Sequence, residues 1–154
     1  MRGMLWLCFF FFISVSFANQ TMLSQQIQHL EYGEVTHDFF KHHQLIFFFA
    51  STCPHCHKAA PHLKVWADLH QADVIAVSFD RRPLPEFPHI VAVPEALIKT
   101  AFTTQPITFP ALFMMNIQTN QLYPVMIGEW TLPELERRLD SLIEKVKRYE
   151  GGQR

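Results

Sequence analysis

The sequence has little cysteine and no surplus of positive charge. Three cysteines in 154 residues are too few for a miniprotein held together by several disulfides. The 13 lysines and arginines are balanced by 14 aspartates and glutamates, so the chain has no basic field that would hold a phosphate backbone. These two shortages argue against a disulfide scaffold and against a nucleic-acid-binding protein.

Charged residues are scarce as well, and apolar residues are abundant. Only 18% of the chain is charged, whereas 49% is hydrophobic and phenylalanine alone occurs 15 times. A chain with so much apolar surface and so little net charge is not intrinsically disordered. Its length suits one globular domain.

The first residues differ in composition from the rest. Arg2 is followed by a short apolar run over 4–15, and Ser16 and Ala18 are the small residues of a cleavage site. We therefore expect a secretory signal peptide over 1–18, which takes Cys8 with it. The alternative is an uncleaved anchor, although the run is shorter than the roughly 20 residues of a spanning helix. We read the next residues, 19–43, as an N-terminal extension.

A domain over 44–150 begins with a strand, a helix and a second strand. The run QLIFFFA at 44–50 is apolar after its first residue, as in a strand buried on both faces. Pro54 begins a helix over 54–71, which Pro61 is expected to kink, and a second apolar strand covers 72–79. This order is a βαβ unit, in which the two strands run parallel.

The rest of the domain predicts a hairpin and two helices. Residues 80–94 carry four prolines and are expected to form an irregular loop. Beyond it we expect a helix over 95–102, antiparallel strands over 111–117 and 122–127, and a last helix that follows a capping box at Thr131 and Glu134. Pro124 places the last strand at a sheet edge. The predicted fold is α/β, with a central mixed sheet of four to five strands flanked by helices.

The candidate chemistry lies in the sequence Cys-Pro-His-Cys at 53–56. At the N-cap of the helix, the Cys53 sulfur would face free backbone N–H groups and the positive end of the helix dipole, which stabilise a thiolate. A protonated His55 or His57 would add to this effect. Cys56 lies one turn further on the same face, where it can attack a mixed disulfide on Cys53, as thiol–disulfide exchange requires.

Three other interpretations of the motif remain open. The pair could form a structural disulfide. The cysteines could bind zinc together with nearby histidines, namely His55, His57 or His62, although no second CxxC or HxxxH has zinc-finger spacing. Residues 53–57 also match C-x-x-C-H, the attachment motif of c-type haem, although the βαβ context is not typical of haem domains.

The element order and the motif together resemble the thioredoxin fold. Pro110 stands where that fold has its cis-proline, so we expect a cis Phe109–Pro110 peptide bond beside the cysteines. The CPHC tetrapeptide is similar to that of the DsbA family of periplasmic oxidases. Residues 48–57, 83–102 and 106–128 together resemble the TrbB family, the periplasmic thiol–disulfide isomerases of F-type conjugative (type IV secretion) systems, with the resemblance covering about residues 40–148.

Two positions depart from the thioredoxin pattern. Thioredoxin and DsbA carry a buried acid six residues before the first active-site cysteine, where it accepts the proton of the second one. This chain has Phe47 at that position. Bulky Phe109 precedes Pro110, where Thr, Val or Ile is usual, and it would narrow the substrate groove or make it more apolar, unless it serves only in packing.

The resemblance implies a periplasmic thiol–disulfide oxidoreductase or isomerase. It assigns roles to six residues: Cys53 as nucleophile, Cys56 as resolving thiol, Pro54 and His55 as tuning residues, and Phe109 and Pro110 in substrate binding. It implies disulfide-containing secretion or conjugation proteins as clients and a redox partner in the membrane or periplasm. No metal, small-molecule cofactor or nucleic acid is implied, and we expect a monomer. The alternatives are a DsbA-like dithiol oxidase, a c-type haem electron carrier and a non-catalytic thioredoxin-like assembly module.

Overall fold

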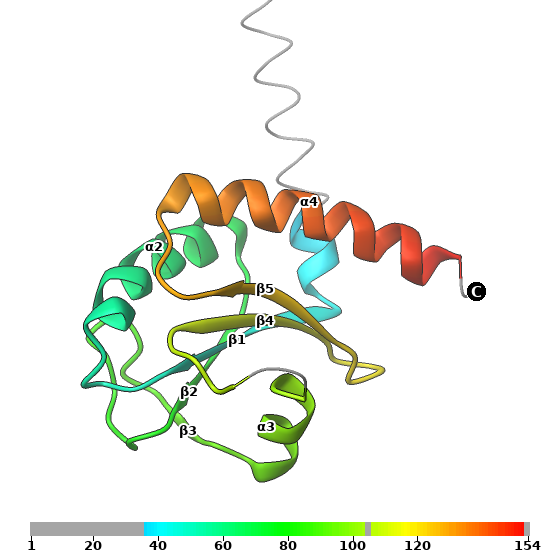
Figure 1. Ribbon diagram of the computed structural model, residues 1–154. Helices are drawn as coiled ribbons and strands as arrows, with labels where there is room; N and C mark the ends of the chain where they lie inside the picture. Colours follow the sequence, from blue (N-terminus) through cyan, green and yellow to red (C-terminus); the bar gives the residue numbers. More distant parts are fainter. Residues whose placement is uncertain (1–35, 104–105, 153–154) are drawn as a thin grey trace, which may run out of the picture. The chain divides into compact units, whose positions relative to one another are not determined.

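The computed structural model describes residues 36–103 and 106–152. The expected signal peptide at 1–18 and most of the expected extension at 19–43 lie outside the described residues. The described residues from 37 onward belong to one compact unit. Figure 1 shows its elements, which are β1 His43–Phe49, α2 Pro54–His70, β2 Val74–Ser78, β3 Val91–Ala92, α3 Glu95–Ala101, β4 Ala111–Asn116, β5 Leu122–Ile127 and α4 Leu132–Gly151.

The strands form one mixed, five-stranded sheet in the order β3-β2-β1-β4-β5. β1 pairs in parallel with β2 and antiparallel with β4, and β5 returns antiparallel to β4. The parallel βαβ unit and the hairpin are therefore confirmed, and Pro124 lies on the edge strand as predicted. Strand order, crossover helix and terminal hairpin confirm the thioredoxin-like fold.

The central strand β1 is apolar from Leu45 to Phe49 because both faces of the sheet are covered. Successive side chains of a strand point to opposite faces. Accordingly Leu45, Phe47 and Phe49 belong to the core on one face. Ile46 and Phe48 belong to the core on the other face. All five side chains are almost fully buried, which explains the absence of polar residues between them.

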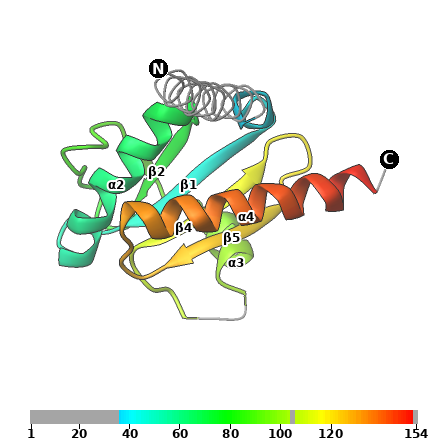
Figure 2. The same cartoon turned by 90° about the horizontal axis from the view of Figure 1, so that it is seen from above.

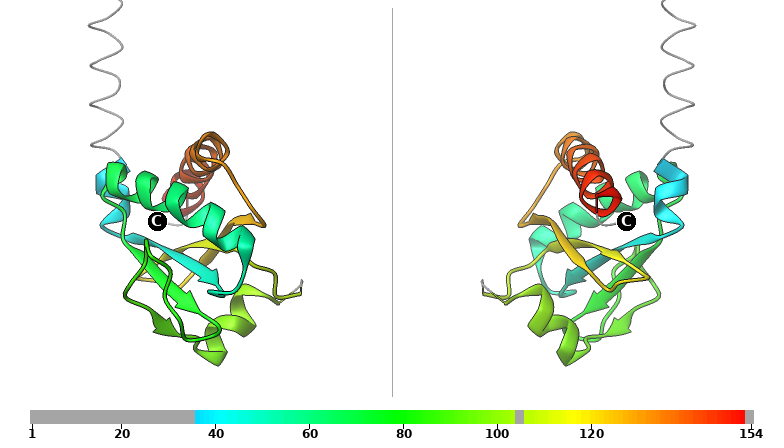
Figure 3. Two further views of the ribbon diagram at one scale, coloured as in Figure 1. Left: turned by 90° about the vertical axis from the view of Figure 1, so that its left-hand side faces the viewer. Right: turned by 90° about the vertical axis from the view of Figure 1, so that its right-hand side faces the viewer.

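The helices cover both faces of this sheet. Seen from above, α2 and α4 lie side by side over the sheet (Figure 2), and they share one core with its inner face. The opposite face is covered by α3 (Figure 3), which contributes Ala101 to the smaller core. Among the described residues, no helix is long and apolar enough to cross a membrane.

Local signals in the sequence fix the helix ends. Pro54 occupies the first position of α2, where its missing N–H costs no hydrogen bond, and α2 continues past Pro61 to a left-handed Gln71. At the start of α4, the Glu134 carboxylate accepts hydrogen bonds from the Thr131 N–H and hydroxyl at 2.9 and 2.8 Å. The predicted cap at Thr131 is therefore confirmed.

One strand was not predicted from the sequence. Residues 80–94, expected to be an irregular loop, contain the two-residue strand Val91–Ala92 at the edge of the sheet. Its two residues are exposed and lie in a short apolar run over 90–93, which stands among the prolines that favoured a loop. The strand forms where Val91 and Ala92 pair with β2.

Candidate active site

Cys53 lies at the end of the turn between β1 and α2, and it is the N-cap residue of that helix. The backbone N–H of Cys56 points at its sulfur, with a nitrogen–sulfur distance of 3.3 Å. Both cysteines are free thiols, and Cys53 is half-buried. This is the expected arrangement, in which an N–H group at the positive helix end faces the sulfur that must carry negative charge.

Cys56 occupies a different environment one turn further along α2. Its side chain is completely buried in the core beneath the helix. Burial, followed by the hydrogen bond with Cys53, raises the pKa of the Cys56 thiol well above its ordinary value. The two sulfurs therefore differ in access, with Cys53 half-buried and Cys56 held as a neutral thiol in the core.

The loop before β4 closes the site on a second side. The Phe109–Pro110 peptide bond is cis, which confirms the prediction. The Phe109 carbonyl oxygen lies 4.0 Å from the Cys53 sulfur. The Phe109 ring is half-buried and packs against Phe79 at a centroid distance of 4.6 Å. The structure thus brings Phe109 and Pro110 to the reactive sulfur, as the resemblance implied.

The two histidines next to the cysteines make hydrogen bonds to other groups, and their expected assistance to Cys53 stays a prediction. His55 Nδ1 lies 2.6 Å from the Glu129 carboxylate. His57 Nε2 lies 2.7 Å from the Ser51 carbonyl oxygen and donates to it. Lys58 also reaches Glu129, at 3.2 Å. The hydrogen bond with His55, supported by Lys58, lowers the pKa of the Glu129 carboxyl.

A second acid, Asp80, supports the loop before Cys53. It follows β2, whose carboxyl end lies beside that of β1 because the strands are parallel. Its Oδ2 accepts hydrogen bonds from the Ser51 N–H and hydroxyl at 2.8 and 2.6 Å, and its Oδ1 accepts one from the Ser78 hydroxyl at 2.8 Å. Burial opposes the charge on Asp80, but these hydrogen bonds outweigh it and lower the pKa of its carboxyl to about 2.

Phe47 takes the place of the acid that thioredoxins carry beneath the site. Its ring is fully buried and packs against Phe49, Phe87 and Trp130, with centroids 5.2, 5.5 and 6.0 Å away. The negative charge of Asp80 instead acts on the buried thiol and contributes to its raised pKa. Because Asp80 stays ionised in all but strong acid, it supplies a fixed charge and does not exchange protons near neutral pH.

Sequence reasoning missed Asp80 and Glu129, although a signal for each was present. Asp80 directly follows a strand parallel to β1, and Glu129 follows Gly128 at the end of the hairpin strand that returns toward Pro110. Both therefore lie at the end of the sheet where β1 leads to Cys53. Reading the strand directions together with the charges that follow each strand would have found them.

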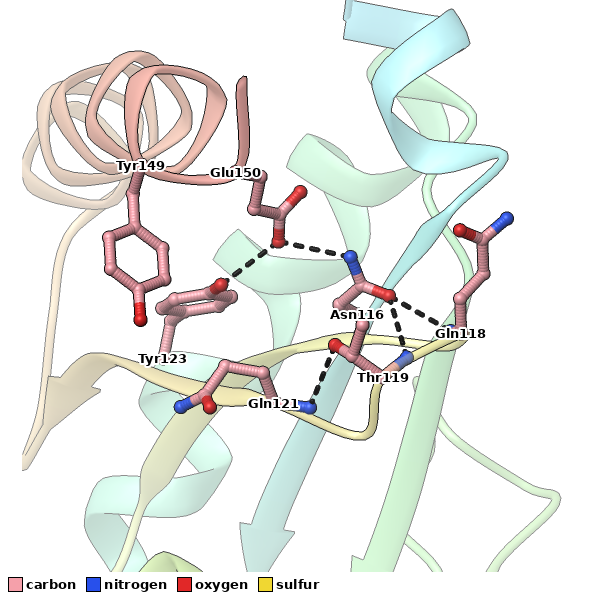
Figure 4. A pocket seen from close by; sticks show the side chains of 7 residues that line it. All are labelled: Asn116, Gln118, Thr119, Gln121, Tyr123, Tyr149 and Glu150. Atoms are coloured by element: carbon pink, nitrogen blue, oxygen red, sulfur yellow. Dashed lines mark hydrogen bonds between the residues drawn. The ribbon is translucent and has the colours of Figure 1, made fainter. Parts of the chain in front are cut away.

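A polar pocket of about 270 Å³ lies apart from the cysteines (Figure 4). In its wall, the Glu150 carboxylate accepts hydrogen bonds from the Asn116 amide at 3.0 Å and the Tyr123 hydroxyl at 2.9 Å. Buried His43 Nε2 lies 3.2 Å from the same oxygen. These contacts tie the end of α4 to the hairpin. No group of three or more His, Cys, Asp or Glu residues in the described ranges could hold a metal ion.

Known proteins similar to this chain include one curated relative and several solved structures. Protein TrbB of Escherichia coli (strain K12) is 26% identical over 109 residues, which make up 71% of this chain and 60% of TrbB. StoA of Bacillus subtilis is 21% identical over 63% of this chain and 81% of its own, with a TM-score of 0.46. The thioredoxin domain of a thiol–disulfide oxidoreductase from Bacteroides vulgatus is 17% identical over 69% of this chain and 82% of its own, also with a TM-score of 0.46.

The profile that describes TraF, the F plasmid transfer operon protein, matches residues 14–139. This match spans most of the chain and includes the CPHC motif, the cis-proline loop and the hairpin. It accords with the likeness to TrbB. The chain therefore belongs to the TraF family and is a distant homologue of TrbB with a thioredoxin-like fold.

Proposed function

We propose that this chain is a periplasmic thiol–disulfide oxidoreductase that acts as an isomerase on disulfide-containing secretion or conjugation proteins. The observation that carries the proposal is the contrast between the two thiols. Cys53 caps α2 and is partly accessible, and its sulfur accepts a hydrogen bond from the Cys56 backbone N–H at 3.3 Å, whereas the Cys56 side chain is fully buried. A nucleophile and a resolving thiol need this arrangement.

The reaction begins at Cys53. Its thiolate attacks one sulfur of a client disulfide, forms a mixed disulfide, and releases the other client sulfur as a thiolate. In the isomerase route, the released client thiolate attacks another disulfide of the client, and the thiolate freed there attacks the client sulfur that is bonded to Cys53. A new client disulfide forms, and Cys53 leaves as a thiolate. The client then has a rearranged disulfide, and no net oxidation or reduction has occurred.

Cys56 provides the exit from a mixed disulfide that does not rearrange. After its thiol loses a proton, its sulfur attacks Cys53, the client leaves with both of its sulfurs reduced, and Cys53 and Cys56 become a disulfide. Burial raises the pKa of Cys56, so little of this thiol is ionised near neutral pH, and this slows the resolving step. Slow resolution gives a client time to rearrange, which supports isomerase activity over the runner-up, a DsbA-like dithiol oxidase.

The cis-proline loop is proposed to position the client. The Phe109 carbonyl oxygen, 4.0 Å from the Cys53 sulfur, lies close to any chain bonded to that sulfur. The half-buried Phe109 ring offers an apolar contact beside it. The proposal also includes export by a signal peptide and action as a monomer. It further includes a redox partner in the periplasm or membrane that restores the redox state of Cys53 and Cys56 after each reaction.

Reactivation of a ribonuclease with scrambled disulfides tests the activity. The purified chain in a glutathione buffer should accelerate reactivation, and Cys53→Ser should abolish the acceleration. Cys56→Ser should retain part of it, because rearrangement on Cys53 needs no resolving thiol. Ser141→Ala, at an exposed position on α4, serves as the control. An unchanged rate with Cys53→Ser would contradict the proposal, as would a wild-type protein without activity.

An absorption spectrum separates this proposal from a c-type haem carrier. Protein exported from cells that mature c-type haem should show no Soret band and should bind two equivalents of thiol reagent when unfolded. One covalent haem per chain would overturn the redox assignment. If neither haem nor exchange activity is found, the non-catalytic assembly module is the remaining candidate.

A further inference from the structure

Glu129 has no assigned role, yet it is the partner of the histidine in the CPHC motif. We propose that Glu129 is a positioning residue that holds the His55 imidazole on its own carboxylate and so makes the redox pair less oxidising than the motif alone would. The inference rests on the proposed function and adds a regulator of its redox balance. It concerns the contact between His55 Nδ1 and Glu129 Oε2, at 2.6 Å.

The backbone on both sides of Glu129 is fixed. Gly128 adopts φ +89°, a conformation suited to glycine, and its N–H donates to the Pro110 carbonyl at 2.8 Å. On the other side, Trp130 is almost fully buried in the core, and Thr131 begins α4. The Glu129 side chain is itself partly exposed, but these anchors keep it at the rim of the site.

These contacts also tie Glu129 to the reactive sulfur. The Pro110 carbonyl that accepts from Gly128 follows the Phe109 carbonyl, which lies 4.0 Å from the Cys53 sulfur. His55 is two residues beyond Cys53, in the first turn of α2. Glu129 is therefore connected to Cys53 on two sides, through the cis-proline loop and through His55, although Glu129 and Cys53 are far apart in the sequence.

The effect on Cys53 depends on how far the Glu129 carboxylate compensates the charge of His55. An imidazolium next to Cys53 favours its thiolate, which stabilises the dithiol form and makes the disulfide more oxidising. Here the negative charge that compensates the imidazolium is the Glu129 carboxylate, and Lys58 at 3.2 Å shares that carboxylate. Cys53 thus receives only part of the stabilisation that an uncompensated His55 would give.

The size of the effect is limited by solvent. The His55 side chain is 61% exposed and that of Glu129 is 38% exposed, so water screens their attraction. Exposed pairs of this kind correspond to roughly two- to fivefold changes in an equilibrium constant. A shift of that size changes the balance between oxidase and isomerase while leaving the chemistry intact.

A double-mutant cycle tests whether Glu129 acts through His55. The four proteins are the wild type, Glu129→Gln, His55→Ala and the double variant, with Glu144→Gln on the exposed face of α4 as the matched control. Cys53 alkylation is followed at about pH 5.5, roughly one unit below the ordinary histidine pKa. The equilibrium with glutathione is measured in parallel, and thermal unfolding checks that each variant is folded.

Glu129→Gln should raise the rate of Cys53 alkylation about two- to fivefold and shift the glutathione equilibrium toward the dithiol by a similar factor. In the His55→Ala background the same substitution should have less than half of that effect. No change in either readout, or an equal change in both backgrounds, would overturn the inference. A wild type that does not equilibrate with glutathione would instead remove the proposed function, so the two failures are distinguishable.

Discussion

The backbone nitrogen of Cys56 lies 3.3 Å from the sulfur of Cys53 and donates its hydrogen bond to it. Cys56 therefore has two roles: its backbone N–H stabilises the nucleophile, and its own thiol lies buried in the core. The cap is possible because β1 ends just before Cys53 and Pro54 begins the helix without an N–H of its own. Helix capping and redox chemistry thus depend on the same geometry.

We predict that Asp80→Asn destabilises the fold by about 1–2 kcal/mol at neutral pH, because the charged carboxylate accepts the hydrogen bonds that anchor Ser51 and Ser78. The pKa of Asp80 is lowered to about 2 in the folded chain. Its contribution is therefore present above the ordinary aspartate pKa and disappears as the pH falls toward 2.

Urea unfolding between neutral and strongly acidic pH measures this effect. The wild type should lose stability more steeply than Asp80→Asn over the acidic range. Asp73→Asn, an exposed position just before β2, is the control and should follow the wild type. Identical pH profiles for the wild type and Asp80→Asn would show that the hydrogen bonds of Asp80 do not stabilise the loop.

Phe47 is predicted to act in packing and not in proton transfer. Phe47→Ala should lower the free energy of unfolding by about 3–5 kcal/mol, because the ring is fully buried among other aromatic side chains. Phe47→Leu should cause a smaller loss and leave Cys53 alkylation unchanged. Denaturant unfolding and alkylation rates check this, and a loss under about 1 kcal/mol for Phe47→Ala would contradict the packing role.

The sequence predicted the elements whose stability comes from local pattern. The apolar run at 44–50 became β1 with a shift of one residue at each end, and 122–127 became β5 without change. Helix α2 was found because Pro54 and the apolar spacing that follows agree. The edge strand Val91–Ala92 was missed because it is only two residues long and lies among prolines, and its pairing with β2 is not visible in the local sequence.

The site was predictable where it is contiguous in the chain and unpredictable where it is assembled by the sheet. The cap at Cys53 and the placement of Phe109 and Pro110 followed from the motif and the resemblance. The direction of His55 did not, because its partner Glu129 is 74 residues away. The partner of a charged side chain is a residue that is close in space, and spacing in the sequence does not reveal which residue that is.

Glu150 is predicted to stabilise the chain without affecting the cysteines. Burial raises the pKa of its carboxyl, but hydrogen bonds from Asn116, His43 and Tyr123 outweigh burial and lower it. Glu150→Ala leaves these donors without their acceptor and should cost about 1–3 kcal/mol in urea unfolding. Glu144→Ala, an exposed position on the same helix, is the control.

The network around Glu150 joins the start of β1 to the end of β4, whereas Cys53 follows the end of β1. Cys53 alkylation should therefore be the same in folded Glu150→Ala and in the wild type. A stability equal to that of the wild type would contradict the proposed anchoring of α4.

Phe109 is predicted to distinguish protein clients from small thiols. Phe109→Ala should slow the reaction with a scrambled ribonuclease several-fold, because the apolar contact beside the Cys53 sulfur is lost. The rate with glutathione disulfide should stay within about twofold of the wild type, since a small disulfide does not need this contact. Equal losses with both substrates would indicate that Phe109 serves only in packing against Phe79.

The central claim is that Cys53 attacks and Cys56 resolves, and trapping the intermediate tests it most directly. Reduced Cys56→Ser and Cys53→Ser proteins are each incubated with glutathione disulfide near neutral pH, quenched with acid and analysed by intact mass and peptide mapping. We predict rapid, stoichiometric glutathione addition at Cys53 in Cys56→Ser, and slow or no addition at the buried Cys56 in Cys53→Ser. Faster addition at Cys56, or equal rates at the two sulfurs, would contradict the assignment.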